Sequence, residues 1–319
     1  MDKQFRSVIF RKACCHIENA YVDKEFIAKQ WPALRDHYES KVDGCSSKEE
    51  FDALMIELLE KSLPLSHCAF ITPEKAAEIA KLDSGDEIAE ALQFSWKKSD
   101  DWLYLRLPSF TIPRFSFGKV LQILKKAKPE QYIVIDVRLN DGGSMSAVGE
   151  LMGLFIGGER VICRTRLQNW QEMEHPLIVY PQPESSNQCN EADVKLAADY
   201  AHTEWRTAHA PPLYLENNLI VLVGQRCYSC GELFAQSVLD YGRGWLVGSK
   251  TAGCVVGGRD DYECGHGYRL LLPFVTMFAP AGQEIEGVGV SPHVNWHFAS
   301  ADTDELTEDE IKAVVTAMR

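Results

Sequence analysis

Apolar residues recur at helical spacing from the start of the chain to about residue 90. Between Glu50 and Leu59 the apolar positions fall three or four residues apart, and the segment from Lys75 to Leu92 repeats that pattern. This periodicity places the apolar side chains on one face of a helix. We therefore predict an N-terminal helical cap domain over residues 1–95.

From Asp101 onward the pattern changes to short apolar runs that alternate with amphipathic segments. The predicted elements are strands over 102–107 and 132–137, helices over 117–127 and 147–155, and a further strand over 218–224. Strands connected by crossover helices form a sheet covered by helices. Residues 96–319 are therefore predicted to form an α/β core.

Three later segments complete the pattern. Residues 172–212 are rich in Pro, Glu, Asn and His, with one helix-like run over 191–206, and we interpret them as an insertion or lid. A loop without regular structure is the alternative. Strands are predicted over Tyr268–Pro273 and Val275–Ala279, and an acidic helix over Thr307–Met318.

Composition narrows the possible partners and location. The 319 residues are enough for roughly two domains. A net charge of −13 and a pI of about 5.2 argue against nucleic acid or an anionic membrane as partner. The first residues lack the apolar run of a secretory signal, no run is long enough to span a membrane, and there are ten cysteines. We expect a soluble, cytoplasmic protein, and the sequence leaves open whether it forms a homo-oligomer.

Ser229 is the first candidate for chemistry. It follows the apolar run Asn218–Gly224 and precedes an amphipathic segment, so it should lie on a strand-to-helix turn. Unpaired N–H groups and the positive end of the helix dipole at such a turn would stabilise an oxyanion. A serine there is also the usual N-cap residue, and this segment alone favours the cap.

Three further segments gain weight from their order along the chain. Gly142 and Gly143 follow a buried strand and could present amide donors, although a tight turn is the simpler interpretation. His67, beside Ser66 at the end of a predicted helix, could act as a general base or be structural. Glu286 lies in a glycine-rich bend, where it could orient a histidine or simply face solvent.

Together with a Gly-x-x-Thr-x-Gly turn, these segments resemble one superfamily over most of residues 50–295. It comprises the tail-specific or C-terminal-processing serine proteases, with the tricorn protease core and interphotoreceptor retinoid-binding protein modules as relatives. The resemblance implies a ClpP/crotonase-like mixed sheet with crossover helices. It also implies a serine peptidase that cleaves unfolded proteins or short peptides. The matching motifs are Ser66–His67, Asp136–Gly143, Ser229–Glu232, Gly248–Gly253 and Glu286–Pro292.

The resemblance also implies a role for each residue. Ser229 would attack the peptide carbonyl and His67 would carry its proton. Ser66 and Glu286 would hold and polarise the histidine, with Glu286 acting through Ser66. Glu284 is the alternative acid. Backbone N–H groups of Gly142 or Gly143 and of Cys230 would form the oxyanion hole.

Two departures from the superfamily pattern restrict this interpretation. The tail-specific branch uses a lysine base after the Thr-x-Gly turn, where this chain has Cys254, and a thiol cannot replace that amine. We therefore follow the tricorn-like branch and keep Lys250 as the alternative base. The 34 residues from His67 to Asp101 are too few for the PDZ domain of tail-specific relatives.

Other motifs are weaker. Cys227 and Cys230 form a CxxC that could be redox-active or bind a metal, but without a partner pair we favour packing and predict no metal or cofactor. Cys230 lies one residue past the turn, which disfavours it as nucleophile. Ser249 stands where a phosphate loop needs glycine, which excludes nucleotide binding there.

A non-catalytic protein that binds an apolar ligand or a peptide on the same fold remains the alternative function. It would need a wide apolar pocket. The aromatic residues that could line it are Trp102, Phe110, Phe115, Phe274 and Phe278. A scaffold that has lost its activity is a third possibility, and it predicts no reaction with serine-directed phosphonates.

Overall fold

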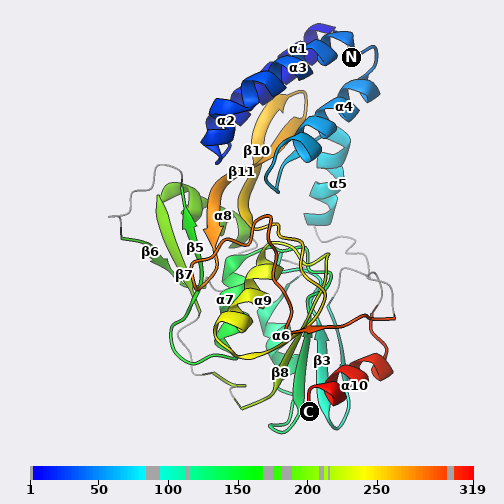
Figure 1. The fold of residues 1–319 in the computed structure, drawn as a ribbon, viewed down its shortest axis with the longest axis vertical. Coiled ribbons are helices and arrows are strands. Elements are labelled where there is room, and N and C mark those ends of the chain that lie inside the picture. The colour runs from blue at the N-terminus through cyan, green and yellow to red at the C-terminus, as the bar shows by residue number, and fades with distance from the viewer. Residues whose placement is uncertain are drawn as a thin grey trace. The chain divides into compact units, whose positions relative to one another are not determined.

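The computed structural model describes residues 3–83, 94–111, 115–167, 175–181, 189–207, 212–214, 216–299 and 305–319. The chain forms two compact units (Figure 1). The first draws on residues 1–87, 166–172 and 256–276, and the second on 88–165, 173–255 and 277–319. The first unit therefore contains the predicted helical cap together with residues 256–276, which the sequence pattern had assigned to the core.

Helices dominate the first unit, as predicted. Its helical elements are α1 (Lys3–Ala20), α2 (Lys24–Lys29), α3 (Trp31–Gly44), α4 (Lys48–Glu57), the π-helical turn η1 (Leu58–Ser62) and α5 (Pro73–Asp83). Asp23 and Ser47 cap the starts of α2 and α4 by accepting backbone N–H groups. No described helix of the chain is long and apolar enough to cross a membrane.

The first unit also contains a three-stranded antiparallel arrangement. Strand β11 (Tyr268–Phe278) pairs with β1 (Ala69–Ile71) and with β10 (Val256–Gly265). The predicted break at Phe274, between strands Tyr268–Pro273 and Val275–Ala279, is wrong, because β11 is continuous from Tyr268 to Phe278. Pro273 lies opposite Gly258 at a shift in register, where its missing N–H costs no ladder bond. Strand β10 was missed because its sequence is polar.

The second unit is built on a six-stranded sheet in the order β12-β9-β8-β4-β3-β2. Its strands are parallel except for the antiparallel edge pair β2 and β3. The strands predicted over 102–107, 132–137 and 218–224 are confirmed. The bounds are β2 Ser95–Lys98, β3 Trp102–Arg106, β4 Tyr132–Asp136, β8 Leu219–Val223, β9 Gly244–Gly248 and β12 Val294–Asn295.

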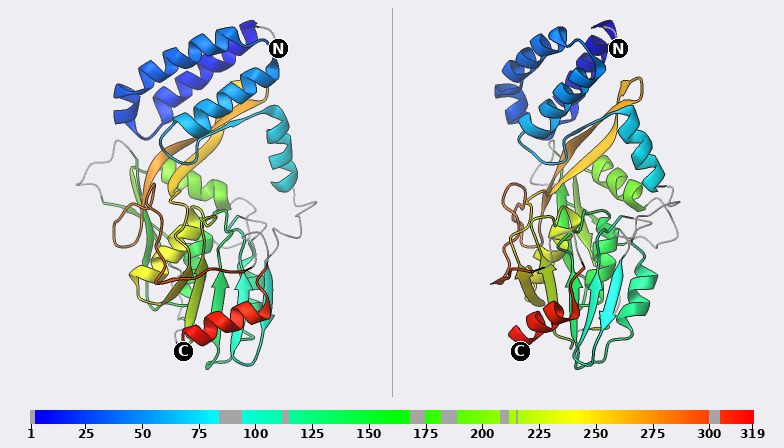
Figure 2. Two further views of the ribbon diagram at one scale, coloured as in Figure 1. Left: turned by 45° about the vertical axis from the view of Figure 1, so that its right-hand side comes forward. Right: turned by 90° about the vertical axis from the view of Figure 1, so that its right-hand side faces the viewer.

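Alternate residues of these strands enter two different hydrophobic cores. Leu103 and Ile133 pack in the core that contains α6 (Phe117–Leu124), α7 (Met145–Gly153) and α9 (Cys230–Asp240). Tyr104 and Val134 pack in the core that contains α10 (Glu308–Ala317), the predicted acidic helix (Figure 2). The sheet is therefore covered on both faces, which explains why its strands read as continuous apolar runs.

The described residues of the predicted insertion, 175–181 and 189–207, contain regular structure. They form β6 (Leu177–Val179), α8 (Cys189–Asp199) and β7 (His202–Arg206), and β7 lies between β5 (Val161–Arg166) and β6. The helix predicted over 191–206 therefore ends at Asp199. Trp205 in β7 is 1% exposed, so burial of this ring favours a strand over the helix that the polar composition suggested.

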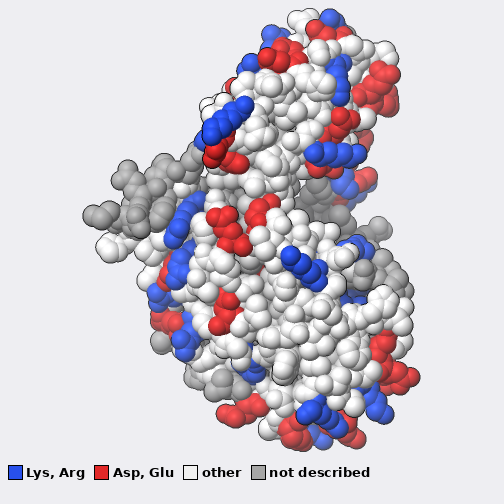
Figure 3. Space-filling view, viewed as in Figure 1, with Lys and Arg blue, Asp and Glu red and all other residues white. Residues whose placement is uncertain are grey.

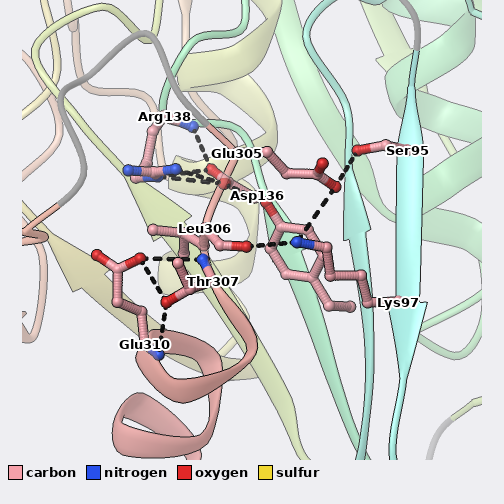
Figure 4. Close-up of polar contacts among 9 residues, drawn as sticks. Ser95, Lys97, Asp136, Arg138, Glu305, Leu306, Thr307 and Glu310 are labelled. Carbon is pink, nitrogen blue, oxygen red and sulfur yellow. Dashed lines mark hydrogen bonds and ion pairs between the residues drawn. The ribbon is translucent and has the colours of Figure 1, made fainter.

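A buried ion pair closes the end of β4. Figure 4 shows the Arg138 guanidinium directed at the Asp136 carboxylate, with Nε to Oδ1 at 3.0 Å and a terminal nitrogen to Oδ2 at 2.9 Å. The Tyr104 hydroxyl also donates to Asp136, at 2.7 Å. The two charged side chains are only 2% and 3% exposed. Their pairing fixes the direction in which the chain leaves the sheet.

The segment before α10 is attached to the edge strand β2. Ser95 donates to Glu305 at 2.6 Å, and the Lys97 ammonium donates to the Leu306 carbonyl at 2.6 Å (Figure 4). Thr307 and Glu310 then form a capping box that starts the helix. These contacts occupy side chains of an edge strand that would otherwise be an open site for pairing.

Replacing Asp136 by Ala should lower the free energy of unfolding of the second unit by about 3–5 kcal/mol, because it leaves the Arg138 charge buried without its counter-ion. Urea denaturation measures the change. Asp101→Ala is the matched control, since Asp101 pairs with Arg319 at the surface, where both side chains are more than half exposed. That control should cost less than about 1 kcal/mol. Equal effects of the two substitutions would contradict the role of the buried pair.

Candidate active site

Ser229 lies on the turn between β8 and α9, as predicted. It occupies the position before the first helical residue with φ 51° and ψ −118°. An ordinary N-cap residue has extended backbone angles, and a non-glycine residue in this region costs on the order of 1–3 kcal/mol. Two hydrogen bonds hold the turn, from the Ser229 N–H to the Cys254 carbonyl at 3.0 Å and from the Tyr228 N–H to the Asn140 carbonyl at 2.8 Å.

The carboxylate of Glu232, on the first turn of α9, holds the backbone of Ser229 by a hydrogen bond. Glu232 is fully buried. Its Oε2 accepts the N–H groups of Ser229 at 3.2 Å and of Cys254 at 2.8 Å, and its Oε1 accepts the Gly253 N–H at 2.7 Å and the Thr251 hydroxyl. Burial raises the pKa of Glu232, and these hydrogen bonds counter that shift. One side chain thus joins the serine turn to the 251–254 turn.

The Gly142–Gly143 loop packs directly against Ser229. A Cβ atom at Gly142 would lie 2.7 Å from the Ser229 Cβ, and one at Gly143 would lie 2.3 Å from the Phe110 carbonyl carbon. Both glycines have positive φ, at 90° and 135°, so only glycine fits at either position. The Gly142 N–H donates to the Asn140 side chain at 2.9 Å. This amide is therefore engaged within the loop.

The two cysteines of the CxxC motif serve packing. Cys230 Sγ donates to the Gly143 carbonyl at 3.0 Å, and Cys227 is fully buried. Burial raises the pKa of both thiols, whereas a redox-active or nucleophilic cysteine has a lowered pKa. The cysteines at positions 14, 15, 45, 68, 163, 227, 230, 254 and 264 are free thiols. Among the described residues, no group of His, Cys, Asp and Glu is placed to hold a metal ion.

Glu286 reaches the same segment as Ser229. Its Oε2 accepts the Val255 N–H at 2.6 Å, and the Gly287 N–H donates to the Gly253 carbonyl at 2.8 Å. Ser229 and Glu286 are 57 residues apart in sequence (286 minus 229), yet both bond to residues 253–255. The alternative acid Glu284 and the alternative base Lys250 have exposed side chains.

Ser66 and His67 form a hydrogen-bonded pair in the first unit. Ser66 Oγ and His67 Nδ1 are 2.8 Å apart. His67 has φ 56°, and a Cβ atom at Gly258 would lie 3.1 Å from the His67 Cβ, so strand β10 passes the histidine closely. The structure thus brings Ser66 and His67 together in one unit. In the other unit it brings together Ser229, Gly142, Gly143, Cys230 and Glu286.

Sequence reasoning missed the roles of Asn140 and Glu232. Asn140 is fully buried, donates to the Leu107 carbonyl at 2.8 Å and accepts the Gly142 N–H. Both residues lie inside motifs that we matched, but the sequence analysis assigned no role to either of them. The sequence signal is a polar residue in an apolar segment at the end of a strand or the start of a helix. Such a residue is buried with its neighbours and must therefore form hydrogen bonds.

Three of the five aromatic residues proposed to line an apolar pocket are core residues. Trp102, Phe110 and Phe115 are 3%, 0% and 2% exposed. The rings of Phe110 and Phe115 meet edge to face, with centroids 5.5 Å apart. Side chains packed in this way leave no room for a ligand between them. The apolar-ligand alternative is therefore not favoured.

The profile of Peptidase family S41 matches residues 101–296, and that of the tricorn protease C1 domain matches residues 2–60. The first match covers more than half of the chain, which therefore belongs to peptidase family S41. The resemblance to the C-terminal-processing proteases and the tricorn core is confirmed. No curated protein was found to match the chain by sequence.

Solved structures share the fold at low sequence identity. A protein described as a candidate peptidase from Parabacteroides merdae has a TM-score of 0.66 at 14% identity, over 100% of this chain and 97% of that one. A lipoprotein from Streptococcus agalactiae gives 0.60 at 14%, over 99% and 96%. A photosystem II D1 C-terminal processing protease gives 0.56 at 14%, over 93% of each chain. The predicted α/β fold with a helical N-terminal part is confirmed.

Glu232→Gln should loosen the serine turn. The amide places an NH2 group opposite the N–H donors of Ser229 and Cys254. The Cys254 N–H then loses its acceptor and the Ser229 N–H keeps only the Cys254 carbonyl, at a cost of about 1–3 kcal/mol. Thermal unfolding and faster hydrogen exchange at Gly253 and Cys254 measure this effect.

Asp240→Asn is the matched control for that substitution. Asp240 ends the same helix and accepts the N–H of Ala281 at 3.0 Å and the side chain of Gln283. The control should leave exchange at residues 253–254 unchanged. Unchanged exchange in Glu232→Gln as well would contradict the role given to this carboxylate.

Proposed function

We propose that the protein is a serine peptidase in which Ser229 is the nucleophile and His67 the general base. Membership of the S41 family supports peptidase activity. The observation that carries the assignment to Ser229 is its strained backbone on the strand-to-helix turn, packed against Gly142 in a loop whose two glycines no other residue could replace. Strain held in place by a buried hydrogen-bond network is typical of functional residues.

The oxyanion donors in this proposal are the N–H groups of Gly143 and Cys230. Gly142 was a candidate, but its N–H already donates to Asn140. The Gly142 carbonyl accepts the Phe110 N–H at 2.7 Å, and in a trans peptide the Gly143 N–H points the opposite way. Cys230 begins α9, where backbone N–H groups have no partner within the helix.

The hydrogen bond between Ser66 and His67 supports the histidine as base. With Nδ1 bonded to Ser66, Nε2 is the nitrogen assigned to take the proton from Ser229.

Glu286 completes the proposed machinery as the acid that polarises Ser66. Its attachment to the Val255 N–H places it on the segment that also bonds Ser229. A carboxylate that acts through a serine keeps the negative charge off the imidazole while still favouring one tautomer. Lys250, with an exposed side chain, is the alternative base if His67 proves dispensable.

Each step of the proposed reaction balances protons and bonds. Ser229 Oγ attacks the peptide carbonyl carbon as His67 accepts the hydroxyl proton, and the oxyanion is held by the Gly143 and Cys230 amides. The C–N bond then breaks as His67 returns that proton to the amine. Water, deprotonated by His67, hydrolyses the acyl-enzyme and regenerates Ser229.

Neutral, unfolded peptides are the proposed substrate class. Next to Ser229 the exposed residue is Tyr228, 37% accessible, and Val288 in the adjoining glycine-rich turn is 57% accessible. Figure 3 shows one face of the second unit, on which the Lys, Arg, Asp and Glu side chains lie mostly toward the margins. Apolar side chains exposed beside the nucleophile suit an extended chain without strong charge.

Ser229→Ala should abolish cleavage of a fluorogenic unfolded-protein substrate and leave Tm within a few degrees of the parent value. A labelled fluorophosphonate followed by peptide mass spectrometry should modify Ser229 of the parent protein and leave the variant unlabelled. Cleavage retained by the variant would exclude Ser229 as nucleophile.

His67→Ala should reduce kcat by several orders of magnitude, because the serine hydroxyl loses its proton acceptor. In the parent protein, activity should rise with pH as the imidazole becomes neutral. Lys250→Ala is the matched control and should retain near-parental kcat. The opposite pattern, a silent His67→Ala and an inactive Lys250→Ala, would make Lys250 the base.

A further inference from the structure

A buried carboxylate from α8 lies at the start of α7, directly after the Gly142–Gly143 loop. Asp193 Oδ2 accepts the Ser144 hydroxyl at 2.6 Å and the Ser146 N–H at 3.1 Å, and Oδ1 accepts the Ser146 hydroxyl at 2.9 Å. Asp193 is 3% exposed, and Ser144 and Ser146 are as deeply buried. Three hydrogen bonds thus join α8, from the predicted insertion, to α7 in the core.

Ser144 passes this restraint to the glycine loop. It is the N-cap of α7, where its Oγ accepts the Ala147 N–H at 3.3 Å while donating to Asp193. Its own N–H donates to the Phe110 carbonyl at 3.2 Å. The residue after Gly143 is therefore fixed through both its backbone and its side chain, and Asp193 is the partner that comes from outside the loop.

Gly143 is held on each of its two peptide planes. The plane before it is set by the bond from the Phe110 N–H to the Gly142 carbonyl. The plane after it is set by Cys230 Sγ, which donates to the Gly143 carbonyl, and by the Ser144 N–H. A shift of Ser144 would rotate the second plane and tilt the Gly143 amide, because adjacent planes share the Gly143 Cα atom.

The electrostatics of the contact between Asp193 and the two serines indicate that stabilising the fold is not its main role. Burial raises the pKa of Asp193, and the hydrogen bonds from Ser144 and Ser146 counter the shift only in part. A carboxyl group with a raised pKa stabilises the fold most below its ordinary pKa, and that contribution is lost as pH rises through the raised value. Ionisation of Asp193 therefore carries a desolvation cost.

We propose that Asp193 is a positioning residue for catalysis, which acts through Ser144 to hold the Gly143 amide where the oxyanion forms. This inference rests on the proposed function, since the oxyanion arises only from attack by Ser229. Helix α8, in the segment that the sequence predicted to be a lid or a loop, would then help to position a catalytic group. Because the oxyanion bond forms in the transition state, the effect should fall on kcat and leave KM nearly unchanged.

The test compares Asp193→Ala and Asp193→Asn with the parent protein on a fluorogenic peptide. Asp193→Ala should lower kcat on the order of tenfold to hundredfold, as expected for a displaced oxyanion donor. Asp193→Asn should recover most of that loss, because the amide oxygen can accept Ser144 and the Ser146 N–H. Rates are normalised to the folded fraction from near-ultraviolet circular dichroism.

Asn217→Ala is the matched control for a lost buried polar side chain. Asn217 is 6% exposed and donates to the carbonyls of Lys128, Pro129 and Gln131. It precedes β8, at the opposite edge of the parallel strands from the loop that follows β4. Asn217→Ala should destabilise the second unit while preserving kcat. An equal fall in kcat in Asn217→Ala and Asp193→Ala would overturn the inference.

A double-mutant cycle tests the route through Ser144. If Asp193 acts through that hydroxyl, Ser144→Ala and Asp193→Ala should have non-additive effects on kcat, and both should speed hydrogen exchange at residues 142–146. Additive effects, or an unchanged kcat in Asp193→Ala with an active parent, would overturn the inference and leave the proposed function intact. A parent protein with neither cleavage nor a fluorophosphonate adduct would overturn both.

Discussion

The four hydrogen bonds that converge on the Glu232 carboxylate are the constraint on which the candidate site depends. They join the first turn of α9 to the turn at residues 251–254, and so hold Ser229 in backbone angles that it would not adopt alone. The segment held by Glu232 continues into Val255, which binds Glu286. A single buried acid therefore organises both Ser229 and the segment that binds Glu286.

A second buried carboxylate holds the start of α7 in a similar way. This carboxylate, Asp193, binds the first turn of the helix that follows the glycine loop. Both carboxylates have a raised pKa because burial disfavours their charge. Both sit where helix N–H groups and the helix dipole favour an anion. The proposed catalytic geometry of this unit thus rests on two helix starts, each fixed by an acid that is costly to bury.

Much of the fold could be predicted from the sequence because it follows from local apolar patterns. The strands of the large sheet are buried on both faces, so Tyr132–Val137 and Asn218–Gly224 stood out as apolar runs. Strand β10 could not be found in this way, since its polar residues pair through the backbone with β11. The continuity of β11 through Pro273 depends on a shift in register beside it, where Phe274 of β11 is the extra residue, and no local pattern encodes that shift.

The candidate site, too, could be predicted from the sequence only in part. Spacing and resemblance led to the prediction of Ser229, Gly143 and Glu286 as site residues, but the contacts of Asn140, Glu232 and Asp193 emerge only from three-dimensional partners. The central claim is that Ser229 carries the acyl group. Rapid quench of the protein with an activated peptide ester, followed by peptide mass spectrometry, tests it most directly: the account predicts an acyl adduct on Ser229, formed in a burst of one per chain. Turnover with no adduct, or with the acyl group on Cys254, would contradict it.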